Sequence, residues 1–345
     1  EIYTLSLHDA LPISRRVLRE LDARRPEMRG RLVALSGNLN GLRRTLRYVD
    51  RDLNRLWTES QIAEARARHA DLSDERREQG ELLAIIEREL ERHDQRQPVI
   101  FLDLHSTSGG GPPFTIIGDT LHNRRLALAL GIPVILGLEE TVDGTLLGWL
   151  AGAGHVAVGI EGGQNEAPET IDNHEAAIWI ALVTNGQIDP RDVPELPAHR
   201  VRLAAAAAGL PQVVEIRYRH DLKPDERFEM EGLFTNFQPI EADQLLARSW
   251  TARGASEVRA REGGVLLMPR YQGQGLDGFF EAAELVLEQR TDVRYVIAGE
   301  VQPGYESTWN ELLEHHPSVR SRLQLLGLVP RDRRARRRQS HGDNA

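Results

Sequence analysis

The chain has 345 residues, of which 40% are hydrophobic, enough to bury the core of one large domain or of two. Its formal net charge of −9 argues against a general nucleic-acid-binding protein, and the absence of cysteine restricts any metal site to histidines and carboxylates. No apolar run approaches the roughly 20 residues of a membrane span, and the N-terminal residues lack the pattern of a signal peptide. We therefore expect a soluble, cytoplasmic globular protein.

The opening peptide, EIYTLSLHDALPIS, differs in composition from the rest of the chain. It contains no arginine, whereas the remainder is rich in arginine and alanine, and Lys223 is the only lysine. The peptide also resembles the translation of a common sequencing-library adapter. We therefore expect residues 1–14 to be a non-native leader, with the protein proper beginning at residue 15.

Alternating helical and strand patterns follow the opening peptide. A short helix is predicted over residues 15–24 and exposed helices over 59–94. Continuous apolar runs of strand length predict buried strands at GRLVALSGN, QPVIFLDLHST, PFTIIG, IPVILG and HVAVGIEGG, and the helical stretches LHNRRLALAL and GTLLGWLAGA lie between them. This alternation predicts an α/β domain over residues 15–205, with a largely parallel sheet covered by helices on both faces.

The pattern changes twice in the second half of the chain. Short β-like stretches separated by Gly and Pro predict a small β-rich domain over residues 206–280. Residues 281–330 then predict a Rossmann-like α/β unit, with helices at EAAELVLEQR and WNELLEHH and strands at VRYVIAGE and LQLLG. Residues 331–345 contain six Arg against two Asp, which is typical of a disordered basic tail.

Three stretches hold the polar residues that a site at the strand ends would use: RYVDRDLNR, DLHST and GIEGGQ. Taken singly, each has a simple structural explanation as a solvated loop, a hydrogen-bonded histidine or a helix cap. Two of the three end apolar strands of one predicted sheet, and sites in α/β proteins gather at the carboxyl ends of such strands. Together the three stretches predict a single site.

The order RYVDRDLNR, DLHST, IEGGQ resembles the succinylglutamate desuccinylase/aspartoacylase family. These enzymes are zinc amidohydrolases with a carboxypeptidase-like core and a small C-terminal β domain. The likeness extends from about residue 15 to about residue 280 and includes GGVLLMPRYQGQGLDGFF. It implies an α/β fold with a zinc-carboxypeptidase-like mixed sheet flanked by helices and a small β-rich second domain. Beyond the likeness, residues 281–330 add a C-terminal α/β appendage to this expected fold. It also implies an enzyme that removes an acyl group from an N-acyl amino acid, or a related amide or ester, by metal-activated water.

The resemblance further implies a role for each matching residue. His105 binds Zn²⁺ through its neutral imidazole, and Glu161 is the general base that takes a proton from the zinc-bound water. Arg47 stabilises the oxyanion of the tetrahedral intermediate. Asn54 and Arg55 hold a substrate carboxylate, for which the fork of a guanidinium is suited.

Two other residues have a structural alternative beside the functional one. Asp103 lies two residues before His105 on the same side of an extended strand, where it either orients the site or supports the strand. Tyr271 in MPRYQG either reaches the site from the β-rich domain or packs as an ordinary aromatic side chain.

The family's first two zinc ligands, a His and a Glu three residues later, lie in a loop before the first helix. Here that place is occupied by the opening peptide, in which His8 is followed three residues later by Leu11. We therefore expect that this chain lacks two zinc ligands and the first strand of the sheet, and that its activity as written is impaired, because a catalytic zinc normally takes three protein ligands.

Several alternatives stay open. The same residues suit a carboxypeptidase-like metallopeptidase, or a non-catalytic module that binds carboxylates. Residues 281–330 resemble the nucleotide-sugar-binding half of a glycosyltransferase family, joined near Phe280; a genuine C-terminal extension is the alternative origin, and a sugar-nucleotide binder is the function it would imply. The expected partner is a small carboxylate substrate, with no nucleic acid and no membrane. The sequence specifies neither the acyl group nor the oligomeric state.

Overall fold

The computed structural model describes residues 2–6, 11–67, 73–93, 98–223, 226–275, 277–284, 295–297 and 323–325. The chain forms two compact units, Glu1–Glu284 and Leu285–Ala345. In the second unit, β14 (Tyr295–Ile297) and β15 (Leu323–Leu325) pair in parallel. The predicted helix WNELLEHH, the end of EAAELVLEQR and the basic tail lie outside the described residues.

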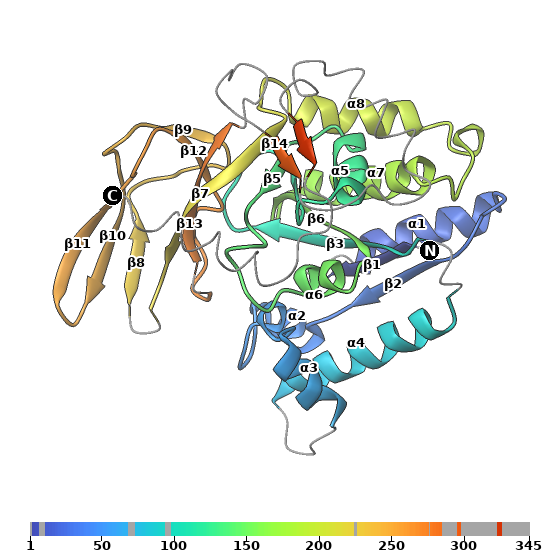
Figure 1. Ribbon diagram of the computed structural model, residues 1–345, viewed down its shortest axis with the longest axis horizontal. Coiled ribbons are helices and arrows are strands. Elements are labelled where there is room, and N and C mark those ends of the chain that lie inside the picture. The colour runs from blue at the N-terminus through green and yellow to red at the C-terminus, as the bar shows by residue number, and fades with distance from the viewer. Residues whose placement is uncertain are drawn as a thin grey trace. The chain divides into compact units, whose positions relative to one another are not determined.

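A ten-stranded mixed sheet extends through the first unit in the order β2-β1-β3-β6-β4-β5-β7-β13-β12-β9 (Figure 1). Strands β2, β1, β3 and β6 are parallel neighbours, β4 is antiparallel to β6, and β4, β5 and β7 are again parallel. The five strands predicted before residue 205 are all present. The strands are β1 (Ile2–Ser6), β2 (Leu32–Ser36), β3 (Ile100–Thr107), β4 (Phe114–Ile116), β5 (Val134–Leu136), β6 (Val156–Gln164), β7 (Val213–Asp221), β9 (Gln238–Ile240), β12 (Gly264–Leu267) and β13 (Asp277–Glu284).

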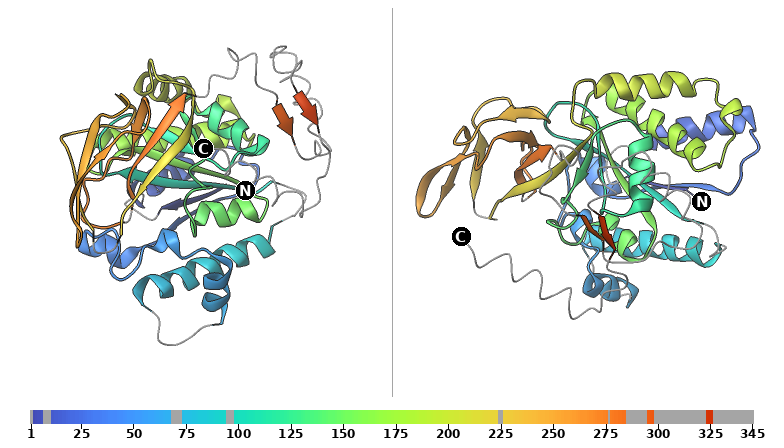
Figure 2. Two further views of the ribbon diagram at one scale, coloured as in Figure 1. Left: turned by 60° about the vertical axis from the view of Figure 1, so that its left-hand side comes forward. Right: turned by 45° about the horizontal axis from the view of Figure 1, so that its top comes forward.

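Helices cover both faces of the α/β part of this sheet. Helices α1, α5, α7 and α8 lie on one side and α3, α4 and α6 on the other (Figures 1 and 2). The helices are α1 (Leu11–Arg24), α2 (Leu39–Arg44), α3 (Glu59–Arg66), α4 (Asp74–Glu91), α5 (Leu121–Ala129), α6 (Leu146–Gly152), α7 (Pro168–Thr184) and α8 (Leu196–Ala206), with 3₁₀ turns η1 (Leu53–Arg55) and η2 (Pro190–Asp192). None of the described helices combines the length and apolar character that a membrane crossing requires.

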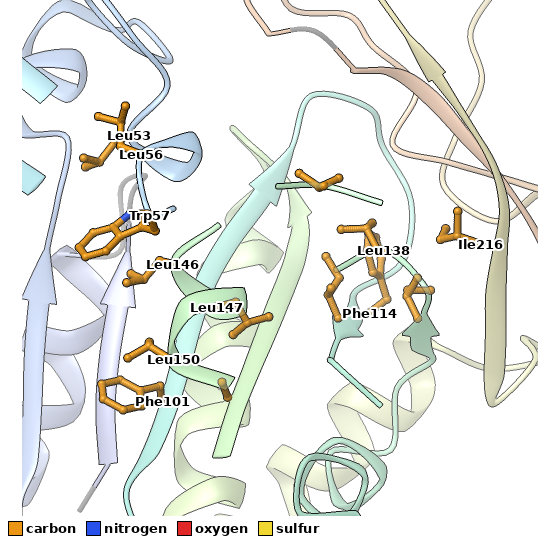
Figure 3. Packing of buried hydrophobic residues seen from close by; sticks show 14 of the residues in the cluster. Leu53, Leu56, Trp57, Phe101, Phe114, Leu138, Leu146, Leu147, Leu150 and Ile216 are labelled. Atoms are coloured by element: carbon orange, nitrogen blue, oxygen red, sulfur yellow. The ribbon is translucent and has the colours of Figure 1, made fainter. Parts of the chain in front are cut away.

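The main core lies between the sheet and helix α6 (Figure 3). Leu146, Leu147 and Leu150 of α6 are buried, and Trp57 stacks on Trp149 of the same helix with ring centroids 5.3 Å apart. Thr145 begins α6 by accepting a hydrogen bond from the backbone N–H of Gly148. Burying a Leu or Phe side chain stabilises the fold by roughly 1.5–3 kcal/mol. This packing fixes α6 beside the carboxyl ends of the central strands.

The β-rich part continues the same sheet. Strand β7 pairs with β5 on one side and with β13 on the other. A three-stranded antiparallel sheet, β8 (Arg227–Met230), β10 (Leu245–Thr251) and β11 (Gly254–Arg259), packs through Leu246 and Phe279 against the strands that extend the large sheet. The α/β part and the β-rich part therefore share one sheet within the first unit.

The expected loss of the first strand is wrong. Residues Ile2–Ser6 form β1, which pairs in parallel with both β2 and β3. The segment IYTLS is rich in residues that fit a strand, and it lies where two parallel neighbours leave hydrogen-bonding groups to satisfy. Helix α1 likewise begins at Leu11 rather than at residue 15. His8 lies outside the described residues.

The prediction of a helix that starts at residue 281 is also wrong for residues 281–284. Residues 281–284 extend β13, pairing with β7 throughout and, at Ala282 and Glu281, with β12 as well. Glu281 is 1% exposed, and its carboxylate accepts a hydrogen bond from the backbone N–H of Arg261 at 3.0 Å. Pairing on both sides overrides the helical preference of the segment EAAE, because propensity is a weak influence beside tertiary contacts.

Candidate active site

Two neighbouring parallel strands bring His105 and Glu161 together. The residues are direct partners in the register of β3 and β6, close to the carboxyl end of each strand. Glu161 is 5% exposed, and Asp103 is 2% exposed with its Oδ2 2.9 Å from His105 Nε2. A buried carboxylate, an imidazole and a second carboxylate therefore lie at the edge of the sheet where α/β proteins form their sites.

The backbone around Glu161 departs from regular pairing. Between His105 and Thr107 the register shifts, because β6 has an extra residue opposite this stretch of β3. Bulges of this kind redirect a side chain next to a site. Three side chains of α7 hold the carbonyl groups there: Thr170 Oγ1 donates to Gln164, Asn173 Nδ2 to Gly162 and His174 Nε2 to Ile160. Helix α7 thus fixes the backbone on both sides of Glu161.

Asp52 holds the loop RYVDRDLNR together through hydrogen bonds to its carboxylate. Its carboxylate accepts hydrogen bonds from Arg47 Nε at 2.9 Å and from the backbone N–H of Asn54 at 3.0 Å. Burial by itself would raise the pKa of Asp52, but the attraction of Arg47 and Arg55 holds that pKa below its usual value. Asn54 Oδ1 accepts from the backbone N–H of Leu146 at 2.9 Å. The start of α6 therefore orients the Asn54 amide, which leaves its N–H₂ group as the donor for a ligand.

Arg55 connects the loop to the β-rich part. Its Nη2 lies 2.8 Å from Asp277 Oδ2, and Arg219 Nε donates to the other oxygen of the same carboxylate at 2.8 Å. Gly144 packs against the backbone of Arg55 with φ +73°, and a Cβ there would lie 2.7 Å from the Arg55 carbonyl oxygen. Only glycine permits this close approach.

The five residues to which the resemblance assigns a role line one pocket: Arg47, Asn54, Arg55, His105 and Glu161. Asp103 lines it as well. The pocket contains about 880 Å³ of empty space, a volume that includes the open solvent at its mouth. Sequence reasoning missed three charged residues of the lining, Glu139, Arg270 and Asp277. Glu139 could have been predicted, because it is a polar residue that follows the apolar run of β5. Arg270 and Asp277 gave no such signal, because they reach the pocket from the β-rich part.

Tyr271 does not line this pocket. It is 40% exposed, and its hydroxyl donates to the carbonyl of Gly232 in the β-rich part at 3.0 Å. The hydroxyl also accepts a hydrogen bond from the backbone N–H of Phe234. Its predecessor in the sequence, Arg270, lines the pocket instead.

Burial raises the pKa of two acidic side chains that line the pocket, Glu161 and Glu139. It raises the pKa of Glu161, against the opposing attraction of His105 and Arg47. It also raises the pKa of Glu139 to about 7, although Thr145 Oγ1 donates to that carboxylate at 2.7 Å. Burial would lower the pKa of His105, but its interaction with Asp103 raises it to about 9.

The donor set does not fit a catalytic zinc ion. Within the part of the chain that the structure describes, no group of three or more His, Cys, Asp or Glu side chains is placed to hold a metal. His105 is accompanied by Asp103 and Glu161, and these three do not form such a group. In the complete sequence, none of the 12 histidines is followed by a glutamate three residues later. The residues that the structure describes therefore do not supply the three protein ligands that a catalytic zinc ion normally takes.

Solved structures with the same fold are succinylglutamate desuccinylases and related proteins. The succinylglutamate desuccinylase/aspartoacylase from Rhodobacter sphaeroides is 17% identical with a TM-score of 0.56, and 82% of this chain and 84% of that one are covered. The succinylglutamate desuccinylase from Vibrio parahaemolyticus is 14% identical with a TM-score of 0.55, covering 82% and 81%. The product-bound ectoine utilization protein EutE (DoeB) from Ruegeria pomeroyi is 17% identical with a TM-score of 0.52, covering 82% and 84%. A comparison with curated protein sequences gives no match.

These similarities define the fold as that of the desuccinylase-like α/β proteins, with a mixed sheet flanked by helices. The sequence model of the succinylglutamate desuccinylase/aspartoacylase catalytic domain matches residues 11–184, half of the chain. The chain belongs to the succinylglutamate desuccinylase/aspartoacylase family, a family of deacylases that act on acyl amino acids.

Proposed function

We propose that the pocket is the acyl-amino acid site of a zinc-dependent deacylase family, and that this chain as written retains its substrate-binding part but not its metal-binding part. The observation that carries the proposal is the convergence of Arg47, Asn54, Arg55, His105 and Glu161 on one pocket. They come from three separate segments of the chain, so their common location is a property of the fold.

The proposed roles follow from what each side chain offers. Glu161 is buried, and burial raises its pKa, so its carboxylate is suited to take a proton from water and return it to the departing amine. Arg47, fixed by Asp52, directs a guanidinium at the oxygen on which negative charge develops. Asn54 presents its amide N–H₂ and Arg55 its guanidinium to the carboxylate of the amino acid. Family membership supports a small acylated amino acid as the ligand.

We propose that this chain has fewer zinc ligands than the other members of its family. Zn²⁺ supplies activated water to these enzymes, and His105 is the residue of this chain that matches a ligand position. The absence of any His-x-x-Glu pair from the sequence supports the loss of two ligands. We therefore expect purified protein to contain less than one zinc ion per chain and to hydrolyse N-acyl amino acids slowly or not at all.

A second candidate, a non-catalytic carboxylate-binding module, is favoured by one specific observation. Asn54 and Arg55 are oriented by Leu146, Asp52 and Asp277, none of which depends on a metal. Carboxylate binding should therefore persist in the absence of zinc.

Two measurements on the full chain test the proposed loss of zinc and the proposed binding of an acyl amino acid. Elemental analysis measures zinc content, and calorimetric titration with N-acetylglycine, with and without EDTA, measures binding. We expect less than one zinc ion per chain and an affinity for N-acetylglycine that EDTA does not change. Arg55→Gln should bind N-acetylglycine more weakly than the exposed control Arg253→Gln. Stoichiometric zinc would overturn the metal part of the proposal. Failure of N-acetylglycine to bind would overturn the assignment of the ligand.

A further inference from the structure

One carboxylate from outside the loop RYVDRDLNR holds the middle of that loop. The backbone N–H groups of Val49, Asp50 and Arg51 all donate to Glu75, at 2.5, 3.1 and 3.3 Å. These three residues belong to no helix or strand, so regular secondary structure does not satisfy their N–H groups. Glu75 takes its place, because one carboxylate satisfies three successive backbone donors at once.

The charge of Glu75 is stabilised where it lies. Glu75 is 1% exposed, and a buried carboxylate costs free energy unless hydrogen bonds satisfy it. It is the second residue of α4, and the unpaired N–H groups of a first helical turn favour a negative charge there. A glutamine at this position would turn an N–H₂ group toward backbone N–H groups. The contact therefore requires a carboxylate.

Helix α4 also holds the chain before and after the loop. Glu78, one turn after Glu75, accepts from the backbone N–H groups of Leu39 and Asn40 at 2.9 and 3.2 Å. Gln79 Nε2 donates to the carbonyl of Leu56, the residue that follows the loop, at 2.5 Å. One face of α4 thus contacts the backbone at three places, and Glu75 makes the middle one.

The two ends of the loop carry residues of the pocket. Arg47 begins the loop, and Asn54 and Arg55 end it. Gln274 accepts from the backbone N–H of Arg47 at 3.1 Å and so fixes the first end separately. Residues 49–51 lie between the ends and determine where the second end begins. Because binding groups must be held within about 0.5 Å of their productive geometry, a shift of this middle segment would misplace one end relative to the other.

We propose that Glu75 is a positioning residue for ligand binding: its carboxylate fixes residues 49–51 and thereby the relative position of the two ends of the loop. The inference rests on the proposed function, in which Asn54 and Arg55 hold the carboxylate of the ligand. The affinity for that ligand then depends on a buried side chain of α4 that acts only through the loop.

The test is calorimetric titration of the full chain and its variants with N-acetylglycine. Glu75→Gln keeps the size of the side chain but removes its charge and one acceptor. We expect it to bind roughly 10-fold more weakly, which is less than the ~100-fold that a displacement of about 1 Å can cost. Glu81→Gln removes an exposed charge from the same helix and should keep the original affinity. Amide hydrogen exchange should become faster at residues 49–51 in Glu75→Gln and not in Glu81→Gln.

A control outside the pocket separates positioning from support of the fold. Asn123 is 1% exposed, donates to the carbonyl of Gly118 at 2.9 Å and accepts from the backbone N–H of Ala157 at 3.0 Å. Asn123→Ala should lower the free energy of unfolding, measured in urea, and leave the affinity unchanged. If it weakens binding as much as Glu75→Gln does, the loss of affinity reflects stability alone and the inference is overturned.

The inference and the proposed function can fail separately. If the unsubstituted chain binds N-acetylglycine and Glu75→Gln binds it equally well, the inference falls and the proposed ligand stands. If the unsubstituted chain does not bind it, both fall together. If Glu75→Gln does not fold, Glu75→Asp takes its place, since it keeps the charge on a shorter side chain. The same loss of affinity is expected of Glu75→Asp, and an unchanged affinity would again overturn the inference.

Discussion

Asn236 Nδ2 donates to Thr107 Oγ1 at 3.0 Å, while Asn236 Oδ1 accepts from the backbone N–H of Met268 at 2.6 Å. Asn236 is 2% exposed and Thr107 is 4% exposed. Thr107 is the last residue of β3, two positions after His105, and Met268 lies two positions before Arg270. One buried amide thus connects the strand that carries His105 to the loop that carries Arg270.

Asn236→Ala should destabilise the first unit by about 2–3 kcal/mol, because a net hydrogen bond contributes about 1 kcal/mol and a buried group left unpaired costs more. Urea unfolding measures the change. A double-mutant cycle with Thr107→Val isolates the interaction, and we expect a coupling energy of about 1 kcal/mol between the two positions. Strict additivity of the two substitutions would contradict the role assigned to this contact.

Gly162→Ala should also destabilise the protein. A Cβ at this position would lie 2.6 Å from His174 Nε2, and the imidazole is only 3% exposed, so it has little room to move. Overpacking of a buried site costs about 1–3 kcal/mol. Urea unfolding of Gly162→Ala, His174→Ala and the double variant provides the measurement.

If the ring causes the clash, Gly162→Ala costs less in the background of His174→Ala than in the unsubstituted chain. An equal cost in both backgrounds would place the strain in the backbone of β6 instead. Gly131→Ala is not a suitable control, because that residue has φ +71° and is strained for a different reason. Gly152→Ala is suitable, since a Cβ there meets no atom within 4 Å and the residue is the last of α6.

Glu139 should make the stability depend on pH. Burial raises its pKa from 4.5 to about 7 in the folded state, with the negative charge of Asp103 adding to the effect and the attraction of Arg55 opposing it. Between these values the folded protein binds more protons than the unfolded chain, so this contribution to stability is fully present below about pH 4.5 and is lost as the pH rises through 7.

Glu139→Gln should therefore show a smaller decrease in unfolding free energy between pH 4.5 and pH 7 than the unsubstituted chain. Chemical unfolding at several pH values measures the two slopes. Glu140→Gln, which removes an exposed neighbouring charge that is only one of the smaller causes of this shift, should keep most of the original slope. Identical slopes for Glu139→Gln and the unsubstituted chain would mean that the Glu139 carboxylate is better solvated than its position indicates.

Zinc should have little effect on thermal unfolding. A ligand that binds only the folded state raises its stability by an amount that depends on the ratio of its concentration to Kd. We propose that the chain lacks two zinc ligands, so equimolar zinc and excess EDTA should give the same unfolding temperature. A rise with zinc that His105→Ala abolishes would indicate that further donors complete a site around His105.

The sequence by itself determined the central part of the fold. Apolar runs predicted β2, β3, β4, β5 and β6, of which β3 to β6 are buried along most of their length. The polar residues at the ends of two of them predicted the position of His105 and Glu161. This succeeded because a strand covered by helices on both faces must be apolar along its length, and because parallel strands end at the same edge. The order of motifs also predicted the family to which the chain belongs.

Only the tertiary structure decided the rest. Residues 2–6 and 281–284 are strands because their neighbours in the sheet pair with them, although the composition of the first and the helical pattern of the second favoured other interpretations. Glu139, Arg270 and Asp277 line the pocket because the segments that follow β5 and β12 and the first residue of β13 lie there. Contacts between segments more than 100 residues apart leave no periodic signal in the sequence, so the charge balance of the pocket follows from the folded chain alone.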